Sequence, residues 1–216
     1  MATATSIPPQ ERLTLTSDGE TIESDLYGRL PATRVAILVH GQNWDASGWR
    51  GVAPLFVARG VPAMAVNLRG HAGSTGKTNR YRADKPWTPV ADLRAAKAAL
   101  RSRGVKEIAL VGSSMGGSAV LASSFEGDVE CVVAISAPVA AVPDELSKKI
   151  TGRKLFVCAD RDSLRATPNV LSCFTAASAP KKLVLFGGRE HSRAMFSAVY
   201  GDEALGEIVE FVCRRG

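Results

Sequence analysis

Three kinds of side chain with complementary chemistry follow apolar segments of this 216-residue chain. Ser114, then Asp160 and Asp162, then His191 each come shortly after a segment with the pattern of a strand. A serine hydroxyl is a poor nucleophile at neutral pH, so an imidazole must accept its proton. A carboxylate must hold that imidazole in the correct tautomer and stabilise its cation. The chain order Ser, Asp, His therefore predicts nucleophilic catalysis by Ser114 with His191 as the base.

The residues around Ser114 form the most informative local pattern. An apolar run at 107–111 leads into Gly-Ser-Ser-Met-Gly at 112–116, and small residues at 117–124 follow. A strand, a G-x-S-x-G turn and a helix in this order place the serine on a sharp, strained turn, and the flanking glycines avoid clashes there. The hydroxyl of Ser114 should therefore project into a cleft. The alternative is a glycine-rich turn with a surface serine, because the bare pattern also arises by chance.

Hydrophobic periodicity predicts the elements that must position these residues. Alternating residues at 12–27, around Asp18-Gly19, predict a β-hairpin. Short apolar runs predict strands at 34–39, 62–68, 106–111, 131–136, 154–158 and 182–186. Helical patterns occur at 49–59, 89–103, 115–124, 163–177 and, in two pieces, 192–214.

This alternation predicts an α/β fold with a mostly parallel, doubly wound sheet and an antiparallel hairpin at its N-terminal edge. Ligands of such sheets bind at the carboxyl ends of the strands, which is where the candidate residues lie. The length and the 45% hydrophobic content favour a single domain spanning residues 1–216. Residues 1–10 are expected to form a flexible N-terminus.

Motifs across most of the chain resemble those of the α/β-hydrolase family. Val-His-Gly-Gln at 39–42 resembles the oxyanion segment, 67–74 resembles the D-x-R-G-x-G-x-S loop, and 112–116 resembles the nucleophile elbow. Residues 159–162 are similar to the G-x-x-D acid turn, and 188–191 to the stretch that ends in the catalytic histidine. Asn67, Ala72 and Ala159 depart from the family pattern, but none of them removes a reactive group.

The resemblance implies roles for the acid and the base. It favours Asp162 as the acid, because Asp162 has the family spacing, whereas Asp160 could cap a helix or lie at the surface. It implies that His191 is the base, since neither His40 nor His71 matches the base position.

The resemblance also implies an oxyanion hole and a substrate site. The backbone N–H groups of Gln42 and Met115 resemble the pair that stabilises a developing oxyanion. His71 and Trp44 are the candidate substrate-binding residues, although Trp44 could equally anchor the loop. Trp49 is expected in the core, and Trp87 lies in a loop with no assigned role.

The resemblance also implies which branches of the family this chain does not fit. A serine at the elbow argues against dehalogenases and epoxide hydrolases, which place aspartate there, and against dienelactone hydrolases, which place cysteine. Cap domains are inserted after the sixth strand, and only a short segment separates Pro138 from Lys154. We therefore expect no large cap and an open cleft, as in small carboxylesterases, acyl thioesterases and serine aminopeptidase-like hydrolases.

Composition excludes several other classes. The net charge of +6 comes from dispersed basic residues without interleaved aromatics, so nucleic-acid binding is not expected. The densest basic segment, 80–85, is typical of a solvated surface, although an acidic substrate could approach there. Neither a membrane span nor a leader pattern occurs, and the four cysteines lie far apart. These features predict a cytoplasmic protein with free thiols, no metal site, no cofactor and no membrane partner.

The combined expectation is a serine hydrolase that cleaves a carboxylic ester or thioester through an acyl-Ser114 intermediate. Its substrate would be a small molecule or an acyl-carrying compound. One alternative is a hydrolase-like protein that binds a ligand without turning it over. Others are a peptidase, a lyase or an acyltransferase that uses the same three residues.

Overall fold

The computed structural model describes residues 8–82, 84–138 and 144–214. Within them, eight strands form one sheet with the order β1-β2-β4-β3-β5-β6-β7-β8. Most of the segment expected to be a flexible N-terminus lies outside the described residues. At its end, the Gln10 N–H donates a hydrogen bond to the Leu26 carbonyl oxygen, so pairing at the sheet edge starts before β1.

The predicted N-terminal hairpin is confirmed. Strands β1 (Glu11–Ser17) and β2 (Glu20–Tyr27) pair antiparallel. Asp18 and Gly19 connect them with φ angles of 49° and 83°. Two successive positive φ angles characterise the two-residue turn whose twist matches that of the paired strands, and Asp-Gly is a preferred sequence for it.

The rest of the sheet is parallel, apart from the antiparallel pairing of β2 with β4. Its strands are β3 (Arg34–Val39), β4 (Ala63–Val66), β5 (Glu107–Ser113), β6 (Cys131–Ile135), β7 (Arg153–Ala159) and β8 (Lys181–Phe186). All six overlap the predicted strands. The expectation of a mostly parallel sheet with an antiparallel N-terminal edge is therefore confirmed.

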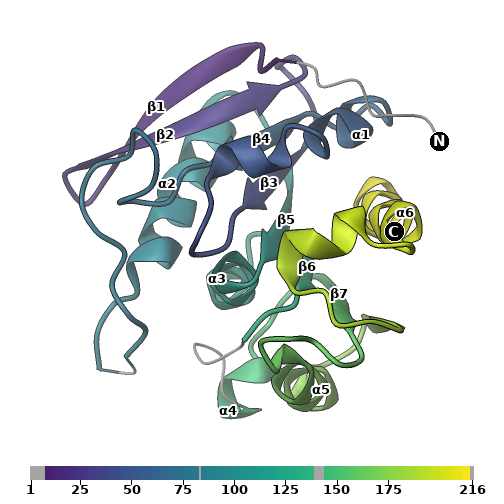
Figure 1. Cartoon of the computed structure of the whole chain (residues 1–216). Helices are drawn as coiled ribbons and strands as arrows, with labels where there is room; N and C mark the ends of the chain where they lie inside the picture. Colours follow the sequence, from purple (N-terminus) through teal and green to yellow (C-terminus); the bar gives the residue numbers. More distant parts are fainter. Residues whose placement is uncertain (1–7, 83, 139–143, 215–216) are drawn as a thin grey trace.

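Helices cover both faces of the sheet (Figure 1). They are α1 (Ala53–Val57), α2 (Thr88–Ser102), α3 (Met115–Ser123), α4 (Asp144–Ser147), α5 (Ala166–Ala176) and α6 (Gly201–Cys213), with short 3₁₀ segments η1 (Ala46–Trp49), η2 (Ser124–Glu126) and η3 (Ser192–Ser197). Alternate strand residues enter two separate cores: Ile37 belongs to the same core as Leu93 of α2, and Leu38 to the same core as Phe56 of α1. Coverage of both faces explains why these strands are apolar without alternation.

Two features differ from the predicted elements. Of the helix expected at 49–59, only the part from 53 to 57 is α-helical, as α1, and Trp49 is the last residue of η1. Pro54 lies in the first turn of α1, a position that proline favours. Helix α4 was not predicted, because four residues carry too little periodicity to be recognised. It is the only helix described between β6 and β7, so no large cap is present there.

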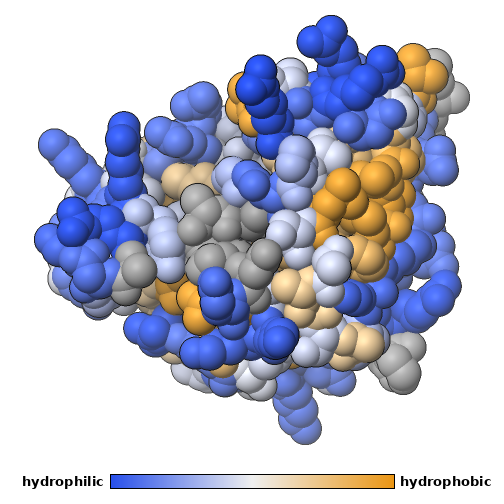
Figure 2. Space-filling view, turned by 90° about the horizontal axis from the view of Figure 1, so that it is seen from below, coloured by the Kyte–Doolittle hydropathy of each residue, from blue (hydrophilic) through white to orange (hydrophobic). Residues whose placement is uncertain are grey.

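None of the helices in the described ranges has the length and apolar character that crossing a bilayer requires. Hydrophilic side chains cover much of the face seen in Figure 2, and hydrophobic ones gather towards one side of it.

Candidate active site

Ser114 lies between β5 and α3 in a conformation that ordinary residues rarely adopt. Its φ is 54° and its ψ is −119°. A Cβ atom on Gly112 would lie 2.1 Å from the carbonyl oxygen of Gly116, and one on Gly116 would lie 2.4 Å from the carbonyl oxygen of Val39. Glycine is thus required on both sides of the serine, because the strand, the turn and the helix pack backbone against backbone. Strain of this kind concentrates at functional sites.

The serine belongs to a continuous chain of three hydrogen-bonded side chains. Ser114 Oγ lies 2.9 Å from His191 Nε2. His191 Nδ1 lies 2.9 Å from each carboxylate oxygen of Asp162. An N–H at Nδ1 that donates to the carboxylate leaves Nε2 free to accept the serine proton, which is the tautomer that a general base needs.

Asp162 is held as a carboxylate. Its side chain is fully buried, and burial by itself opposes ionisation. Hydrogen bonds from His191 and from the backbone N–H groups of Leu164 and Ala166 outweigh that effect, so the pKa of the Asp162 carboxyl is lowered from its ordinary value. A permanently charged carboxylate in a buried position is suited to stabilising an imidazolium beside it.

Asp160, the alternative acid, points elsewhere. Its Oδ1 accepts a hydrogen bond of 2.9 Å from the Gly188 N–H and lies 3.4 Å from Arg161 Nε. The Gly188 N–H bond lowers the pKa of the Asp160 carboxyl. The structure therefore brings Asp162 into contact with His191, whereas Asp160, directly after β7, binds the loop that precedes His191.

Three buried serines, which sequence reasoning missed, hold the His191 loop against the sheet. The Ser192 N–H donates to Ser136 Oγ at 3.1 Å, and the Ser192 and Ser113 hydroxyls lie 2.5 Å apart. Ser192 adopts a φ of 61°, so these bonds support an otherwise unfavourable backbone. The only signal of this support in the sequence was the position of two serines at strand ends, Ser113 as the last residue of β5 and Ser136 directly after β6.

His40 determines the direction of the Gln42 N–H. His40 Nδ1 lies 2.7 Å from the Gly41 carbonyl oxygen, and Nε2 accepts from the Leu68 N–H at 3.0 Å, so the ring is neutral with its proton on Nδ1. Burial lowers its pKa to about 4. Because the peptide bond is planar and trans, a Gly41 carbonyl that faces His40 turns the Gln42 N–H to the opposite side.

The two backbone N–H groups expected in the oxyanion hole are free to bind a ligand. Among the described residues, neither the Gln42 N–H nor the Met115 N–H donates to a protein acceptor. Met115 is the first residue of α3, where the N–H groups of a helix lack partners and the helix dipole favours negative charge. Gly41 lies against the serine, since a Cβ on it would approach Ser114 Cβ to 3.2 Å.

Trp44 packs against Gly41 of the oxyanion segment and is not among the residues that line the pocket described below. Its ring packs 5.3 Å from the Trp49 ring, and the Arg193 guanidinium lies 5.3 Å from its centroid. A Cβ on Gly48 would lie 2.0 Å from the ring, and one on Gly41 would lie 2.6 Å from its Nε1. These contacts agree with the alternative in which Trp44 anchors the oxyanion segment, and its substrate-binding role stays a prediction. Trp49 is buried in the core, as expected.

A pocket of about 750 Å³ opens next to Gln42 and Met115. His71, the other candidate substrate-binding residue, lines it and also contacts the oxyanion segment, with Nε2 2.9 Å from the Gln42 carbonyl oxygen. Trp87 lines the pocket as well. The remaining lining residues are Asn43, Arg69, Gly70, Gly76, Lys77, Thr78, Asn79, Arg80, Tyr81, Ser118 and Pro138. In the part of the chain that the structure describes, no cluster of His, Cys, Asp or Glu side chains could hold a metal ion.

Comparison with known families agrees with this architecture. The model described as "Alpha/beta hydrolase family" matches residues 36–211. The chain belongs to the alpha/beta hydrolase family. The comparison with curated proteins gave no match.

Solved structures share the alpha/beta hydrolase fold over nearly the whole chain. A predicted CIB-like hydrolase from Thermoplasma acidophilum has a TM-score of 0.75 at 20% identity, covering 94% of this chain and 97% of that one. The esterase Pf2001 from Pyrococcus furiosus has a TM-score of 0.78 at 18% identity, covering 93% and 90%. A monoacylglycerol lipase from Paleococcus ferrophilus has a TM-score of 0.74 at 16% identity, covering 89% and 98%. The fold expected from the resemblance is confirmed.

Proposed function

We propose that this alpha/beta hydrolase is a serine hydrolase that cleaves a carboxylic ester or thioester through an acyl-Ser114 intermediate. The observation that carries the proposal is the hydrogen-bonded chain of Ser114, His191 and Asp162, in which Oγ lies 2.9 Å from Nε2 and Nδ1 lies 2.9 Å from the carboxylate. A nucleophile, a base and an orienting carboxylate within hydrogen-bond distance constitute a catalytic triad.

In this reaction Ser114 Oγ attacks the acyl carbon while its proton passes to His191 Nε2. The carbonyl oxygen becomes negatively charged and receives hydrogen bonds from the Gln42 and Met115 N–H groups. The tetrahedral intermediate then collapses, and the bond to the leaving oxygen or sulfur breaks as His191 returns the proton to it.

Water completes the cycle. It gives a proton to His191 Nε2, attacks the acyl carbon and releases the carboxylic acid, and the proton returns to Ser114 Oγ. Asp162 stabilises the imidazolium in both halves of the cycle, and its lowered pKa keeps it charged throughout.

The structural neighbours support an ester-type substrate. The Pyrococcus furiosus protein is an esterase, and the Paleococcus ferrophilus protein is a monoacylglycerol lipase. A related structure is described as Est1E from Butyrivibrio proteoclasticus with bound ferulic acid. The pocket has no large cap over it, so a small molecule or an acyl group on a larger carrier could enter.

The proposal includes a cytoplasmic location without nucleic-acid or membrane partners. It is supported by the cysteines, since none of the four forms a disulfide in the structure. A reducing compartment preserves free thiols.

Labelling with a fluorophosphonate tests the proposal directly. Wild-type protein should gain the mass of one adduct, and Ser114→Ala should gain none, because only an activated serine reacts. Wild-type protein should also hydrolyse p-nitrophenyl esters or acyl thioesters, and Ser114→Ala should not. Absence of labelling and turnover in the wild type would contradict the proposal and favour a ligand-binding protein.

A further inference from the structure

The pocket adjoins the oxyanion segment and the start of α3. Its lining includes Gln42 and Met115, which carry the oxyanion donors, but not Ser114, His191 or Arg193. The leaving group must contact His191 Nε2, because that nitrogen protonates it. A pocket that adjoins the oxyanion donors without including His191 therefore suits the acyl part of the substrate.

The charged side chains that line this pocket are all positive. Arg69, Lys77 and Arg80 line it, and no carboxylate occurs among its described lining residues. The Arg69 guanidinium is already paired with Asp92 at 2.7 Å and with Asp18 at 3.3 Å.

Lys77 and Arg80 are the uncompensated cations. Within the described ranges, neither makes an ion pair or a side-chain hydrogen bond. Arg82, two positions further, is different because it pairs with Asp84 at 2.9 Å. The pocket thus presents two free positive charges to a bound ligand.

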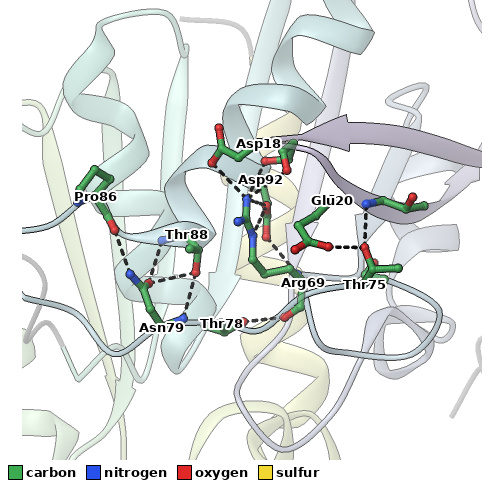
Figure 3. A network of polar contacts seen from close by, with 12 residues as sticks. Asp18, Glu20, Arg69, Thr75, Thr78, Asn79, Pro86, Thr88 and Asp92 are labelled. Carbon is green, nitrogen blue, oxygen red and sulfur yellow. Dashed lines mark hydrogen bonds and ion pairs between the residues drawn. The ribbon is translucent and has the colours of Figure 1, made fainter.

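The loop that carries these cations is held firmly in place (Figure 3). Thr75 Oγ1 donates to Glu20, and Thr78 Oγ1 donates to the Arg69 carbonyl oxygen at 2.7 Å. Lys77 lies between these two fixed points. The backbone that carries Lys77 is therefore in place before a ligand arrives, and binding needs to order only the side chain.

The segment after Lys77 is fixed in the same way. Asn79 Oδ1 accepts from the Thr88 N–H at 2.9 Å, and Asn79 Nδ2 donates to the Pro86 carbonyl oxygen at 2.9 Å (Figure 3). The Trp87 indole N–H donates to the Asn79 carbonyl oxygen at 3.1 Å. Arg80 follows directly, so its backbone starts from a fixed position.

The same pocket offers apolar surface. Tyr81 and Trp87 form an edge-to-face pair with ring centroids 5.9 Å apart, and Met115 and Pro138 also line the cavity. Aromatic and aliphatic walls favour a hydrocarbon stem, whereas lysine and arginine favour an anionic group at its end.

From this arrangement we infer that the preferred substrates are half-esters or half-thioesters of dicarboxylic acids, whose free carboxylate binds to Lys77 and Arg80. This inference rests on the proposed function, since it concerns the acyl group transferred to Ser114. The carboxylate forms charge-assisted hydrogen bonds while the ester carbonyl lies at the serine.

The test compares matched substrates. The anionic substrate is p-nitrophenyl hydrogen adipate, and the neutral one is p-nitrophenyl heptanoate. The wild type should have a kcat/KM at least tenfold higher for the adipate. Lys77→Met combined with Arg80→Met should lower that ratio at least tenfold. The control is Lys85→Met, an exposed cation of the same loop outside the pocket lining, and it should leave the ratio unchanged.

Two further measurements test whether the preference is electrostatic and whether it concerns the acyl side. Raising the ionic strength from about 0.01 M to about 0.15 M should lower the ratio, because the screening length falls from about 30 Å to about 8 Å. The ester 4-sulfophenyl heptanoate carries its charge on the leaving group instead. A preference for this ester over the adipate would overturn the acyl-side assignment, as would a wild-type ratio near one or a loss of the ratio in Lys85→Met.

Failure of the proposed function would give a different pattern, with no turnover of any ester and no fluorophosphonate adduct. Calorimetric titration of Ser114→Ala with monomethyl adipate tests the charge recognition without turnover. Binding that weakens at least tenfold when Lys77→Met and Arg80→Met are added supports the inference. Absence of binding, or binding that the two substitutions leave unchanged, overturns it.

Discussion

His71 Nε2 lies 2.9 Å from the carbonyl oxygen of Gln42, so a histidine of the β4–α2 loop holds the segment that follows β3. The His40 ring lies 4.5 Å from the His71 ring and holds the preceding carbonyl, that of Gly41. Two imidazoles in contact thus fix two successive peptide units. The Gln42 N–H lies in the first of these units.

The substitution His71→Ala should lower kcat/KM by about tenfold. Loss of an oxyanion donor costs roughly a hundredfold or more, and His71 only positions such a donor, so a smaller effect is expected. Ester hydrolysis and the midpoint of thermal unfolding should be measured together. His71→Gln, which can still donate to the Gln42 carbonyl, should recover part of the activity. Unchanged kcat/KM in His71→Ala would show that the bond does not support catalysis.

Asp162→Asn should lower kcat by about 10³-fold to 10⁴-fold, because an amide cannot hold the required tautomer or stabilise the imidazolium. Asp160→Asn is the matched control and should retain most of the activity, since Asp160 bonds to the Gly188 N–H instead of His191. Both variants should be assayed on the same ester. A larger loss in Asp160→Asn than in Asp162→Asn would reverse the assignment of the acid.

Stability should fall in mild acid because of His40. Its pKa is lowered from 6.5 to about 4 in the folded protein, so the unfolded chain takes up a proton first as the pH falls. The contribution of neutral His40 to the free energy of unfolding is fully present above pH 6.5 and is lost as the pH falls from 6.5 to about 4. It amounts to about 2 kcal/mol between about pH 7.5 and 5.

Urea unfolding at several pH values measures this effect. The free energy of unfolding should fall more steeply with decreasing pH in the wild type than in His40→Asn, because the variant lacks the buried imidazole. Equal slopes in the two proteins would mean that His40 is not held neutral by the fold.

Two glycine-to-alanine substitutions should have opposite effects on stability. Gly112→Ala places a Cβ 2.1 Å from the Gly116 carbonyl oxygen and should cost about 2–3 kcal/mol, because backbone must move. Gly206 lies within α6 with no atom near its missing Cβ, so Gly206→Ala should stabilise the protein by about 0.5–1 kcal/mol. Thermal and urea unfolding of both variants check the signs. A tolerated Gly112→Ala would contradict the backbone packing around Ser114.

Local sequence determined most of the fold. Apolar runs of strand length alternate with helical patterns along this chain, and burial on both faces of a parallel sheet requires such runs. The turn at Asp18-Gly19 and the elbow around Ser114 were predictable from the residue types that they contain. Each needs unusual φ angles or close backbone approach, which only a few residue types allow.

Only the tertiary structure shows which side chains come together in the candidate site. Both Asp160 and Asp162 follow β7, and only the fold shows which of them faces His191. Of the two free cations of the pocket, Arg80 belongs to the basic segment 80–85 that the sequence indicates as solvated surface, and Lys77 lies just before it. The hydrophobic periodicity of a sequence indicates which side of a helix or strand is buried. It does not predict which side chains from separate loops come into contact, because those contacts depend on the packing of elements far apart in the chain.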